Sequence, residues 1–577
     1  MMANSQTREI DCDLLVIGSG AAGLSAAVTA AWHGLKVTVV EKDPVFGGAT
    51  AWSGGWMWVP LNPLAQRAGI IEDPELPRTY LRHELGDRYD ATKVDALLEA
   101  GPHMVSFFER HTALKFVDGN WIPDVHGNVP GAGTRGHQVI AAPYAGRQIG
   151  KLIHKLRPPP SETCFLGMGI MSGPDLYAFL HATHSLKAFV YVARRVSRHL
   201  LDLVLYRRGM QLVNGGALIA RLLKSASDLG VELWVSSPAK QLLANRGVVQ
   251  GAVIGTPNGD VTIRARRATI LASGGFPNDI DRRREMFPRT PTGKEHWSLA
   301  PESTSGDGLR LGEAVGGQVD RSLASPVAWA PVSLVPHRDG SVGHFPHIID
   351  RAKPGIIGVL ADGRRFVNEA DGYYDYVAAM VRAVPEGQEV ASWLICAHAA
   401  QRRYSLGFAK PAPVPLAPYI HSGYLKSGRT IEELARVCGI DPTGLKRTIE
   451  EYNRDARKGE DPAFGRGSTP YNRNGGDPDQ KPNPCVAPIE HGLFYAVKVL
   501  PGSFGTFAGL KTDAHTRVLN ADGDPIPGLH AAGADMSSVM GGYYPSGGIN
   551  IGPAMTFGYV AGRHIAGATA YENADVA

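Results

Sequence analysis

The sequence predicts an α/β protein of two domains, one of which is assembled from both ends of the chain. A strand–helix–strand pattern with a glycine-rich turn opens the chain, short apolar runs and glycine loops return near its C-terminus, and its 577 residues suit two or three domains. We expect a Rossmann-like domain over residues 1–290 and 492–577, with a helical insertion over about 66–207. An inserted α+β cap domain over 291–491 is expected to complete an active site between the domains.

The composition is that of a globular protein with little net charge. Hydrophobic residues make up 44% and charged residues 20%, and 59 Lys and Arg against 55 Asp and Glu give a net charge of +4. This bias is too weak to indicate a nucleic-acid partner. Five scattered cysteines without a CxxC pair favour a reducing compartment, and no His or Cys cluster has metal-ligand spacing. We therefore expect a cytoplasmic protein without a metal centre, signal peptide or membrane-spanning helix.

The first strand and helix predict a dinucleotide-binding turn. Residues 12–17 form a short apolar run typical of a buried parallel strand, and a small-residue helix and a second strand ending at Glu41 follow. The turn reads Gly18, Ser19, Gly20, Ala21, Ala22 and Gly23. In this pattern Gly18 makes the tight turn, Gly20 lets the backbone approach a pyrophosphate, and Gly23 lets the helix pack on the strand. Glu41 would accept hydrogen bonds from a ribose.

Further glycine-rich loops follow the later strands. Three short apolar runs at 231–235, 248–255 and 261–272 predict a three-strand meander that ends at such a loop. Together with the loops after Glu41 and near the C-terminus, it supplies the remaining candidate cofactor residues: Lys42, Gly48, Ala49, Thr50, Ser53, Gly54, Gly55, Ala272, Ser273, Gly274, Asn278, Gly533, Ala534, Asp535, Gly548 and Ile549.

This set of loops resembles the flavoprotein superfamily that includes fumarate reductases and 3-ketosteroid dehydrogenases. The resemblance implies an extended FAD, with its phosphates at the first turn and its isoalloxazine ring near the last loop. No histidine occurs between residues 41 and 60, where the succinate dehydrogenase relatives attach the flavin covalently. We therefore expect FAD to be bound non-covalently.

Two segments resemble the 3-ketosteroid Δ1-dehydrogenases within that superfamily. They are 537–548, which contains Tyr543-Tyr544-Pro545, and 363–377, which contains Tyr373-Tyr374. By this resemblance the Tyr544 hydroxyl and the Gly548 N–H donate to a substrate carbonyl, and Tyr373 is the base, with Tyr374 as the alternative. A tyrosine base needs a pKa lowered from about 10 by neighbouring donors or a positive field. The implied reaction is desaturation of a cyclic ketone next to its carbonyl, with a proton taken by tyrosine and hydride by flavin N5.

The chain departs from the steroid enzymes at two positions. Trp121 stands where those enzymes have a tyrosine that supports the base, and Ile122 replaces a second one. An indole donates one hydrogen bond and accepts none, and its bulk would shorten the pocket. We expect either a 3-oxosteroid or a smaller cyclic ketone such as a cyclohexanone. Ser546 replaces a glycine, and it is either a catalytic hydroxyl or a loop hydroxyl bonded to its surroundings.

Two other functions compete with ketone desaturation. A fumarate reductase-like enzyme would bind a dicarboxylate with arginine, but no arginine lies between Gly533 and Gly562, where that branch places one. The run Arg282–Arg284 is more typical of solvated surface. The other alternative is a flavin-bearing protein that binds ligands without turnover.

The segment 172–207 has helical periodicity and many basic residues. Its apolar residues at helical spacing are Leu186, Phe189, Val190, Val196, Leu200 and Leu203. Such a helix can make peripheral contact with an anionic membrane, or it can be a lid or core-packing helix with a charged outer face. We favour the lid. No NAD(P)H site is evident, so a quinone or a similar electron acceptor is expected.

Overall fold

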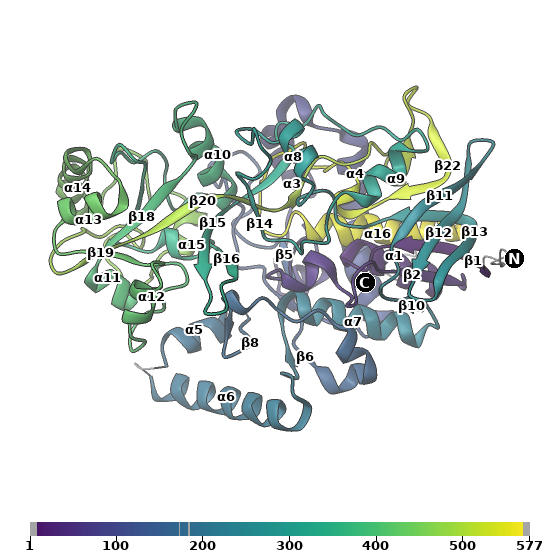
Figure 1. The fold of residues 1–577 in the computed structure, drawn as a ribbon, viewed down its shortest axis with the longest axis horizontal. Coiled ribbons are helices and arrows are strands. Elements are labelled where there is room, and N and C mark those ends of the chain that lie inside the picture. The colour runs from purple at the N-terminus through teal and green to yellow at the C-terminus, as the bar shows by residue number, and fades with distance from the viewer. Residues whose placement is uncertain (1–7, 172, 183–184, 569–577) are drawn as a thin grey trace, which may run out of the picture.

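The computed structural model describes residues 8–171, 173–182 and 185–568, and it contains two large sheets, one in each half of the ribbon (Figure 1). One sheet has eight strands and is mainly parallel along its centre, and the other has seven strands and is mainly antiparallel. The predicted α/β class, with a Rossmann-like sheet and a second α+β region, is confirmed.

Strand β1 (Arg8–Ile17) lies in the middle of the first sheet because its apolar half is buried on both faces. It pairs in parallel with β2 (Val37–Val40) on one side and β13 (Gly259–Leu271) on the other. The remaining strands are β10 (Glu232–Trp234) beside β2, β12 (Val248–Thr256) and β11 (Ala239–Asn245) beyond β13, β22 (Pro525–Ala531), and β21 (Arg517–Leu519). Because β22 pairs in parallel with β13, the C-terminal part of the chain completes the N-terminal sheet.

The predicted meander is present, but its first strand was wrongly identified. The run at 231–235 forms β10, which pairs in parallel with β2 rather than joining the meander. The third antiparallel strand is β11, which pairs with β12. The strand β11, AKQLLAN, is largely exposed and has polar residues at three of its seven positions, so it lacks the long apolar run that marked the other strands.

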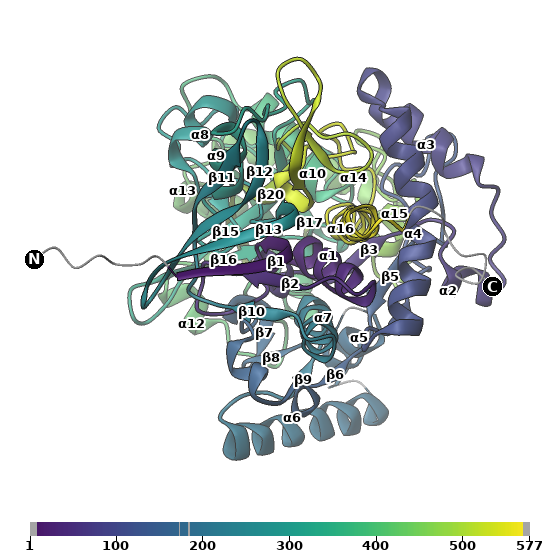
Figure 2. The ribbon, with the colours of Figure 1, turned by 90° about the vertical axis from the view of Figure 1, so that its right-hand side faces the viewer.

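Three helices hold the first glycine turn in place. Helix α1 (Ala21–Trp32) follows β1 directly and is buried from Ala21 to Ala30. Both α16 (Ile551–Ala566) and α7 (Asn214–Asp228) pack against it, and α16 lies beside α1 in Figure 2. This packing places the N-terminus of α1 close to the loop that precedes α16.

The second sheet contains a strand that the sequence assigned to the first domain. Its main order is β16 (Val342–Pro346), β15 (Val327–Pro336), β20 (Phe494–Thr506), β18 (Ser392–Ala397) and β17 (Ile356–Val359), and β14 (Trp297–Ser298) and β19 (Lys426–Gly428) also pair with β20. β20 is therefore central to this sheet, although it lies within the predicted 492–577 segment. Its nearly continuous burial suits a central strand.

The helices expected in the insertion are present. They include α2 (Pro63–Arg67), α3 (Glu75–Leu85), α4 (Ala91–His111), α5 (Pro174–Leu180) and α6 (Leu186–Tyr206), with a small sheet of β3 (Trp56–Trp58), β5 (Gln138–Ala141) and β4 (Phe116–Asp118). Elsewhere the larger helices are α8 (Ile280–Met286), α9 (Asp307–Glu313), α10 (Tyr373–Ala383), α11 (His398–Arg403), α12 (Ala417–His421), α13 (Ile431–Cys438), α14 (Pro442–Ala456) and α15 (Pro470–Gly475), and the short strands are β6 (Tyr144–Ala145), β7 (Cys164–Phe165), β8 (Met168–Gly169) and β9 (Gln211–Leu212).

Helix α6 runs along the edge of the molecule in both ribbon views (Figures 1 and 2). The expectation that its outer face is charged is wrong, because that face exposes mainly large apolar side chains. Among the described residues, no helix combines the length and the apolar character needed to cross a bilayer.

Candidate active site

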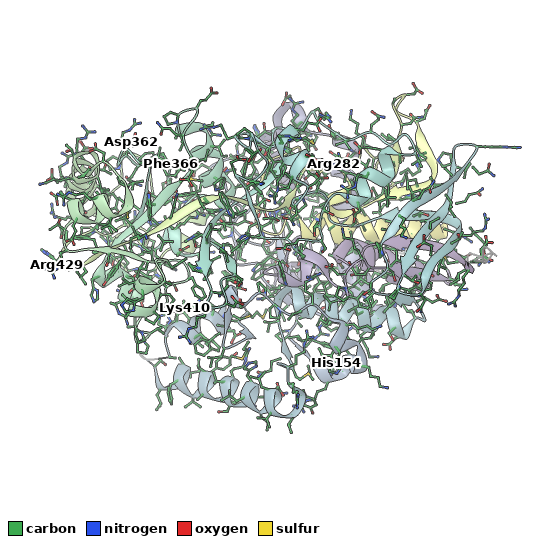
Figure 3. All side chains as sticks on the ribbon, in the orientation of Figure 1. His154, Arg282, Asp362, Phe366, Lys410 and Arg429 are labelled. Carbon is green, nitrogen blue, oxygen red and sulfur yellow. The ribbon has the colours of Figure 1, made fainter. Side chains whose placement is uncertain are left out.

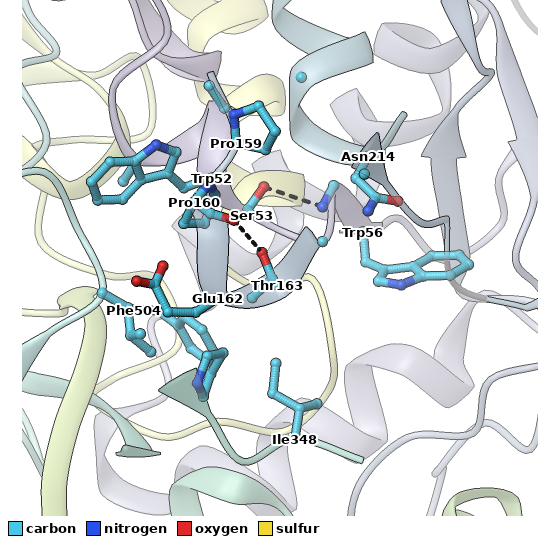
Figure 4. Close-up of a pocket in the computed structure, with 18 of the residues that line it drawn as sticks. Trp52, Ser53, Trp56, Pro159, Pro160, Glu162, Thr163, Asn214, Ile348 and Phe504 are labelled. Carbon is cyan, nitrogen blue, oxygen red and sulfur yellow. Dashed lines mark hydrogen bonds between the residues drawn. The ribbon is translucent and has the colours of Figure 1, made fainter. Parts of the chain in front are cut away.

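One large cavity runs from the glycine turn after β1 to the loop before α16 and on between the first and second sheets. Its volume is about 2490 Å³, well above the roughly 300–1,000 Å³ of a usual single-ligand pocket. Residues from the parts of the chain around both sheets line the cavity. Figure 4 shows Trp52, Ser53 and Trp56 on one side of the space, with Ile348 and Phe504 across from them. The cavity has room for an extended cofactor and a second ligand.

Nearly all the predicted cofactor residues line this cavity. Those that do are Gly18, Ser19, Gly20, Ala21, Ala22, Glu41, Lys42, Gly48, Ala49, Thr50, Ser53, Gly54, Gly55, Ala272, Ser273, Gly274, Asn278, Gly533, Ala534, Gly548 and Ile549. They come from six separate stretches of the chain, which the parallel strands bring to one edge of the first sheet. The two that do not line it are Gly23 and Asp535.

The first turn has the shape that a bound pyrophosphate requires. Gly18 has φ +110°, and a Cβ there would lie 2.1 Å from the Ala272 oxygen, so only glycine fits. A Cβ on Gly23 would lie 2.1 Å from the Gly18 oxygen, which explains why Gly23 packs and does not face the cavity. Gly20 differs, because a Cβ there would meet only the Thr50 hydroxyl, at 3.6 Å. Its backbone is open to the cavity at the N-terminus of α1, where negative charge is favoured.

Glu41 is held at the end of β2 by the same turn. Its carboxylate accepts hydrogen bonds from the Ser19 hydroxyl at 2.5 Å and the Ser19 N–H at 3.2 Å. Burial raises the pKa of Glu41, against the hydrogen bonds that lower it. Lys42 lines the cavity but is engaged by Asp307 at 2.6 Å and Ser305 at 2.9 Å. The donor and acceptor set fits a dinucleotide whose ribose lies at Glu41.

The Asp535 side chain bonds to a protein loop and does not line the cavity. Its buried carboxylate accepts hydrogen bonds from the Ser273 N–H, the Ser273 hydroxyl and the Gly275 N–H at 2.5–2.9 Å. The sequence placed this side chain among the cofactor contacts. The structure instead shows it fixing the 273–275 loop, which forms part of the cavity wall.

Tyr373 and Tyr544 meet in the cavity although 171 positions separate them. Tyr373 is the first residue of α10, Tyr544 lies in the loop before α16, and their ring centroids are 4.9 Å apart. The Asn550 side-chain amide donates to the Tyr544 hydroxyl at 3.2 Å. Tyr374, the alternative base, points elsewhere: its hydroxyl donates to the Gly542 oxygen at 2.9 Å, and it does not line the cavity.

The expectation that protein groups lower the pKa of the Tyr373 phenol is wrong. Burial raises the pKa of Tyr373 well above its usual value, and the neighbouring phenols of Tyr544 and Tyr471 raise it further, while Arg351 lowers it. Burial likewise raises the pKa of Tyr544, and a hydrogen bond with Tyr373 lowers it. Both phenols are therefore neutral at pH 7.

Gly548 is fixed by close backbone packing. It has φ +88°, and a Cβ there would lie 2.7 Å from the Trp58 nitrogen and 2.9 Å from Met57. Its oxygen accepts the Trp58 N–H at 3.1 Å. No protein acceptor in the described part of the chain bonds the Gly548 N–H, and the residue lines the cavity. This N–H is available to a ligand.

A buried polar network holds the loop that carries Tyr544 in place. The Pro545 oxygen accepts the Tyr80 hydroxyl at 2.6 Å and the Val125 N–H at 3.0 Å. The Ser546 hydroxyl accepts from the Gln138 amide at 2.9 Å and bonds to Asp124. Ser546 is fully buried and does not line the cavity, which favours the loop-hydroxyl interpretation.

His126 connects this network to the helix of Tyr373. Its Nδ1 lies 2.7 Å from Glu84 Oε2 and its Nε2 lies 3.2 Å from Asp375 Oδ2, and Asp375 is in the first turn of α10. Burial opposes charge on the ring, but the hydrogen bonds to Asp375 and Glu84 outweigh burial and raise the pKa of His126 to about 10. The imidazolium therefore bridges two carboxylates.

His126→Gln is expected to destabilise the protein more at pH 6 than at pH 10. A raised folded-state pKa contributes stability that is full below the unfolded pKa of about 6.5 and is lost as pH rises through about 10. We expect a melting temperature lower by about 2 °C at pH 6, with the difference shrinking at pH 10. The control is His154→Gln, at an exposed position labelled in Figure 3. An equal loss at both pH values would contradict the charged bridge.

Trp121 lies in the cavity wall. Its ring meets the Trp56 ring edge to face at a centroid distance of 6.0 Å, and it is 46% exposed. A Cβ built on Gly173 would lie 3.4 Å from the indole, so Trp121 sits next to the start of α5. The indole therefore belongs to the cavity wall near α5, and among the described residues no ring contact joins it to Tyr373 or Tyr544.

The cavity arginines are all engaged by protein groups. They are Arg157, Arg208, Arg283, Arg351, Arg402 and Arg403. Arg351, for example, donates to the oxygens of His347, Glu369 and Asp371. A dicarboxylate would need at least one guanidinium with both arms available. This arrangement disfavours fumarate reductase-like binding.

Three cavity residues were not found from the sequence. Tyr471 on α15, Phe504 on β20 and Asn550 line the space around the tyrosine pair. Phe504 packs edge-on against Tyr373 with ring centroids 5.3 Å apart. Asn550 follows Ile549 in the last of the predicted cofactor loops, but its contact with Tyr544 depends on the tertiary fold. In the described residues no cluster of three or more His, Cys, Asp or Glu is placed to hold a metal ion.

Comparison with known proteins agrees with this geometry. Residues 13–551 match the family model described as FAD binding domain. The chain is 41% identical over 570 residues to the 4-oxocyclohex-2-ene-1-carboxylate 5-dehydrogenase of Sinomonas cyclohexanicum, covering 98% of this chain and 96% of that protein. It is 35% identical over 574 residues to a 3-oxosteroid 1-dehydrogenase of Mycolicibacterium smegmatis, covering 97% and 98%.

A solved structure shows the same fold along the whole chain. The 3-ketosteroid Δ1-dehydrogenase of Sterolibacterium denitrificans, solved with 1,4-androstadiene-3,17-dione, aligns with a TM-score of 0.89 at 31% identity and covers 97% of this chain and 100% of that one. The similarity extends over both sheets. The chain therefore belongs to the FAD-binding-domain family of flavoprotein oxidoreductases.

Proposed function

We propose that the protein desaturates a cyclic ketone next to its carbonyl group, using FAD. The single observation that supports this most is the meeting of Tyr373 and Tyr544 beside the free Gly548 N–H in one cavity with the cofactor residues. The relatives named above are dehydrogenases of cyclic ketones. The reaction removes a proton from the carbon next to the carbonyl and a hydride from the following carbon, which leaves a carbon–carbon double bond.

The protein groups have complementary tasks in this reaction. The Tyr544 hydroxyl and the Gly548 N–H donate to the ketone oxygen, where negative charge develops as the proton leaves. The ionised fraction of Tyr373, which is a tyrosinate, accepts that proton and becomes the neutral phenol. Phe504 and Tyr471 exclude water around the phenols and hold Tyr373 in place. FAD, when bound, supplies the hydride acceptor.

We infer that the FAD is held non-covalently. The segment 41–60 contains no histidine, and its residues that line the cavity, 41–43 and 48–56, include no cysteine or tyrosine either. Acid precipitation tests this directly: all the yellow flavin should appear in the supernatant. Flavin that stays with the pellet would show a covalent bond.

The substrate we favour is a single-ring ketone, with a 3-oxosteroid as the alternative. The indole of Trp121 adds bulk to the cavity wall near α5. Lys410, on the second domain where that domain faces α5 (Figure 3), has its ammonium over Phe345 and Phe408 with no carboxylate within 4.0 Å among the described residues. Such a cation would suit a ring that carries a carboxylate.

Trp121→Ala is expected to shift the preference toward steroids. Removing the indole enlarges the cavity at the wall near α5 and leaves the ring contact of Tyr373 with Tyr544 in place. A change of this kind in an apolar wall alters the discrimination between two substrates by about tenfold or more. The measurement is the ratio of kcat/KM for a 3-oxosteroid to kcat/KM for a 4-oxocyclohexanecarboxylate. Trp32→Ala, remote from the cavity, is the control. An unchanged ratio would show that Trp121 does not limit substrate size.

The electrons need a second partner, for which we propose a quinone or a similar acceptor. The sequence contains one glycine-rich dinucleotide turn between a strand and a helix, and the cofactor residues use it. A soluble quinone analogue should therefore support repeated turnover, and NAD(P)⁺ should not.

Anaerobic reduction of the bound flavin tests the proposed reaction. Bleaching at about 450 nm on addition of a cyclohexanone carboxylate or a 3-oxosteroid, with the unsaturated ketone recovered, would support it. No bleaching with either ketone, together with oxidation of a reduced dye by fumarate, would favour the dicarboxylate alternative. Ligand-dependent spectral change without product would favour a non-catalytic binding protein.

A further inference from the structure

The outer face of α6 is the largest concentration of exposed apolar side chains in the described chain. Ten of the 25 large apolar side chains that are exposed lie on this one helix. We define its outer face as Leu186, Val190, Leu200, Leu201 and Val204, which are 79%, 57%, 50%, 53% and 79% exposed. Their spacing places them on one side of the helix. Both ribbon views show no other element beyond this side (Figures 1 and 2).

The exposed charges of α6 are all positive. Lys187, Arg194 and Arg198 are exposed along one border of the outer face. The single acid of the helix, Asp202, is fully buried and bonded to Arg147. Arg195 is turned inward, where it pairs with Asp175 at 2.9 Å. The polar interactions of the helix are therefore on its inner side, and apolar groups and cations remain outside.

We propose that the outer face of α6 docks on the surface of an anionic lipid bilayer. An amphipathic helix that lies in the interface buries its apolar face near the acyl chains and places lysine and arginine beside the headgroups. A second copy of this chain fits less well, because a two-fold contact of this face with itself would bring cations against cations. The charge of the face is complementary to anionic lipid.

The side of α6 that borders the outer face gives this docking a use. Phe189, Val196 and Leu203 line the large cavity from that side, as do several residues of α5. Docking would therefore bring this wall of the cavity next to the bilayer, where quinones dissolve. This use depends on the proposed function, but the docking itself depends only on the exposed face.

Vesicle flotation of the FAD-loaded protein tests the docking. The protein should float with vesicles of phosphatidylcholine and phosphatidylglycerol, much less with phosphatidylcholine alone, and less at high salt because exposed charges are then screened. The double variant Val190→Glu/Val204→Glu should reduce the bound fraction at least tenfold. Neither residue lines the cavity, so turnover with a soluble dye should stay unchanged. The matched control is Val437→Glu, which is 51% exposed on α13.

Other outcomes would overturn the proposal. Absence of wild-type flotation with anionic vesicles would do so, as would equal flotation of the double variant. Self-association of the wild type that the double variant abolishes, without vesicle binding, would assign the face to a second copy of the chain. If the double variant does not fold, Arg194→Glu/Arg198→Glu replaces it, and the same loss of binding is expected. Flotation is measured without substrate, so its result is independent of the proposed reaction.

Discussion

Replacing Tyr373 by phenylalanine should slow reduction of the flavin by the ketone by about 10²–10⁴-fold, the usual contribution of a positioned base. The phenol lies at the N-terminus of α10 and faces the cavity beside Tyr544. Phenylalanine keeps the ring, and so it keeps the contact with Phe504. The measurement is stopped-flow bleaching of the flavin under anaerobic conditions.

The pH dependence of the same rate identifies the phenol as the base. Burial and the neighbouring phenols raise the pKa of Tyr373, while Arg351 and the positive end of α10 oppose this. Below that pKa the ionised fraction grows about tenfold for each pH unit, so the wild-type rate should rise with pH through the neutral range. The residual rate of the Tyr373→Phe variant should be flat.

Tyr374→Phe is the matched control for this variant. Tyr374 is the next residue, it is equally buried, and its hydroxyl bonds to the Gly542 oxygen outside the cavity. Its removal should leave flavin reduction near the wild-type rate. A larger loss in Tyr374→Phe than in Tyr373→Phe would transfer the role of base to Tyr374.

Replacing Tyr544 by phenylalanine should lower the same rate by about 10²–10³-fold, the usual effect of removing one donor to a developing oxyanion. The Asn550 amide donates to this hydroxyl, which leaves the hydroxyl proton available to the ketone oxygen. Because the donor matters most in the transition state, kcat should fall more than KM rises. Flavin content should be unchanged.

The neighbouring Tyr543 provides the control for Tyr544→Phe. It is adjacent in the chain but does not line the cavity, so Tyr543→Phe should keep the wild-type kcat. If Tyr544→Phe raised KM and left kcat unchanged, the hydroxyl would bind substrate and transition state equally, and its assignment as an oxyanion donor would fail.

The sequence predicted the parts of the site that depend on local geometry. The turn from Gly18 to Gly23 needs only a strand, a tight turn and a helix, and the structure has all three, with Gly18 in the tight turn and Gly23 at the contact between strand and helix. The resemblance of two short segments brought Tyr373 and Tyr544 to attention. The structure then places both phenols in one cavity.

The features that the sequence missed depend on contacts between distant segments. Nothing near Asp535 indicates that its carboxylate bonds to residues 273–275. The largely exposed strand β11 forms because it can pair with the edge of β12. Burial sets the direction of the Tyr373 pKa, and burial is a property of the whole fold. The outward direction of the apolar stripe on α6 likewise depends on where the helix docks.

The position of β20 limits how this architecture can be divided. This strand pairs with β15, β18, β14 and β19, yet it follows the second region in the chain and leads directly to the loops of the first sheet. A transplant of residues 291–491 alone between two relatives would pair the strands of the donor with the central strand of the recipient. A chimaera designed to exchange substrate preference therefore has to carry residues 291–506 as one block, and recombination points inside that block should give proteins that fail to fold.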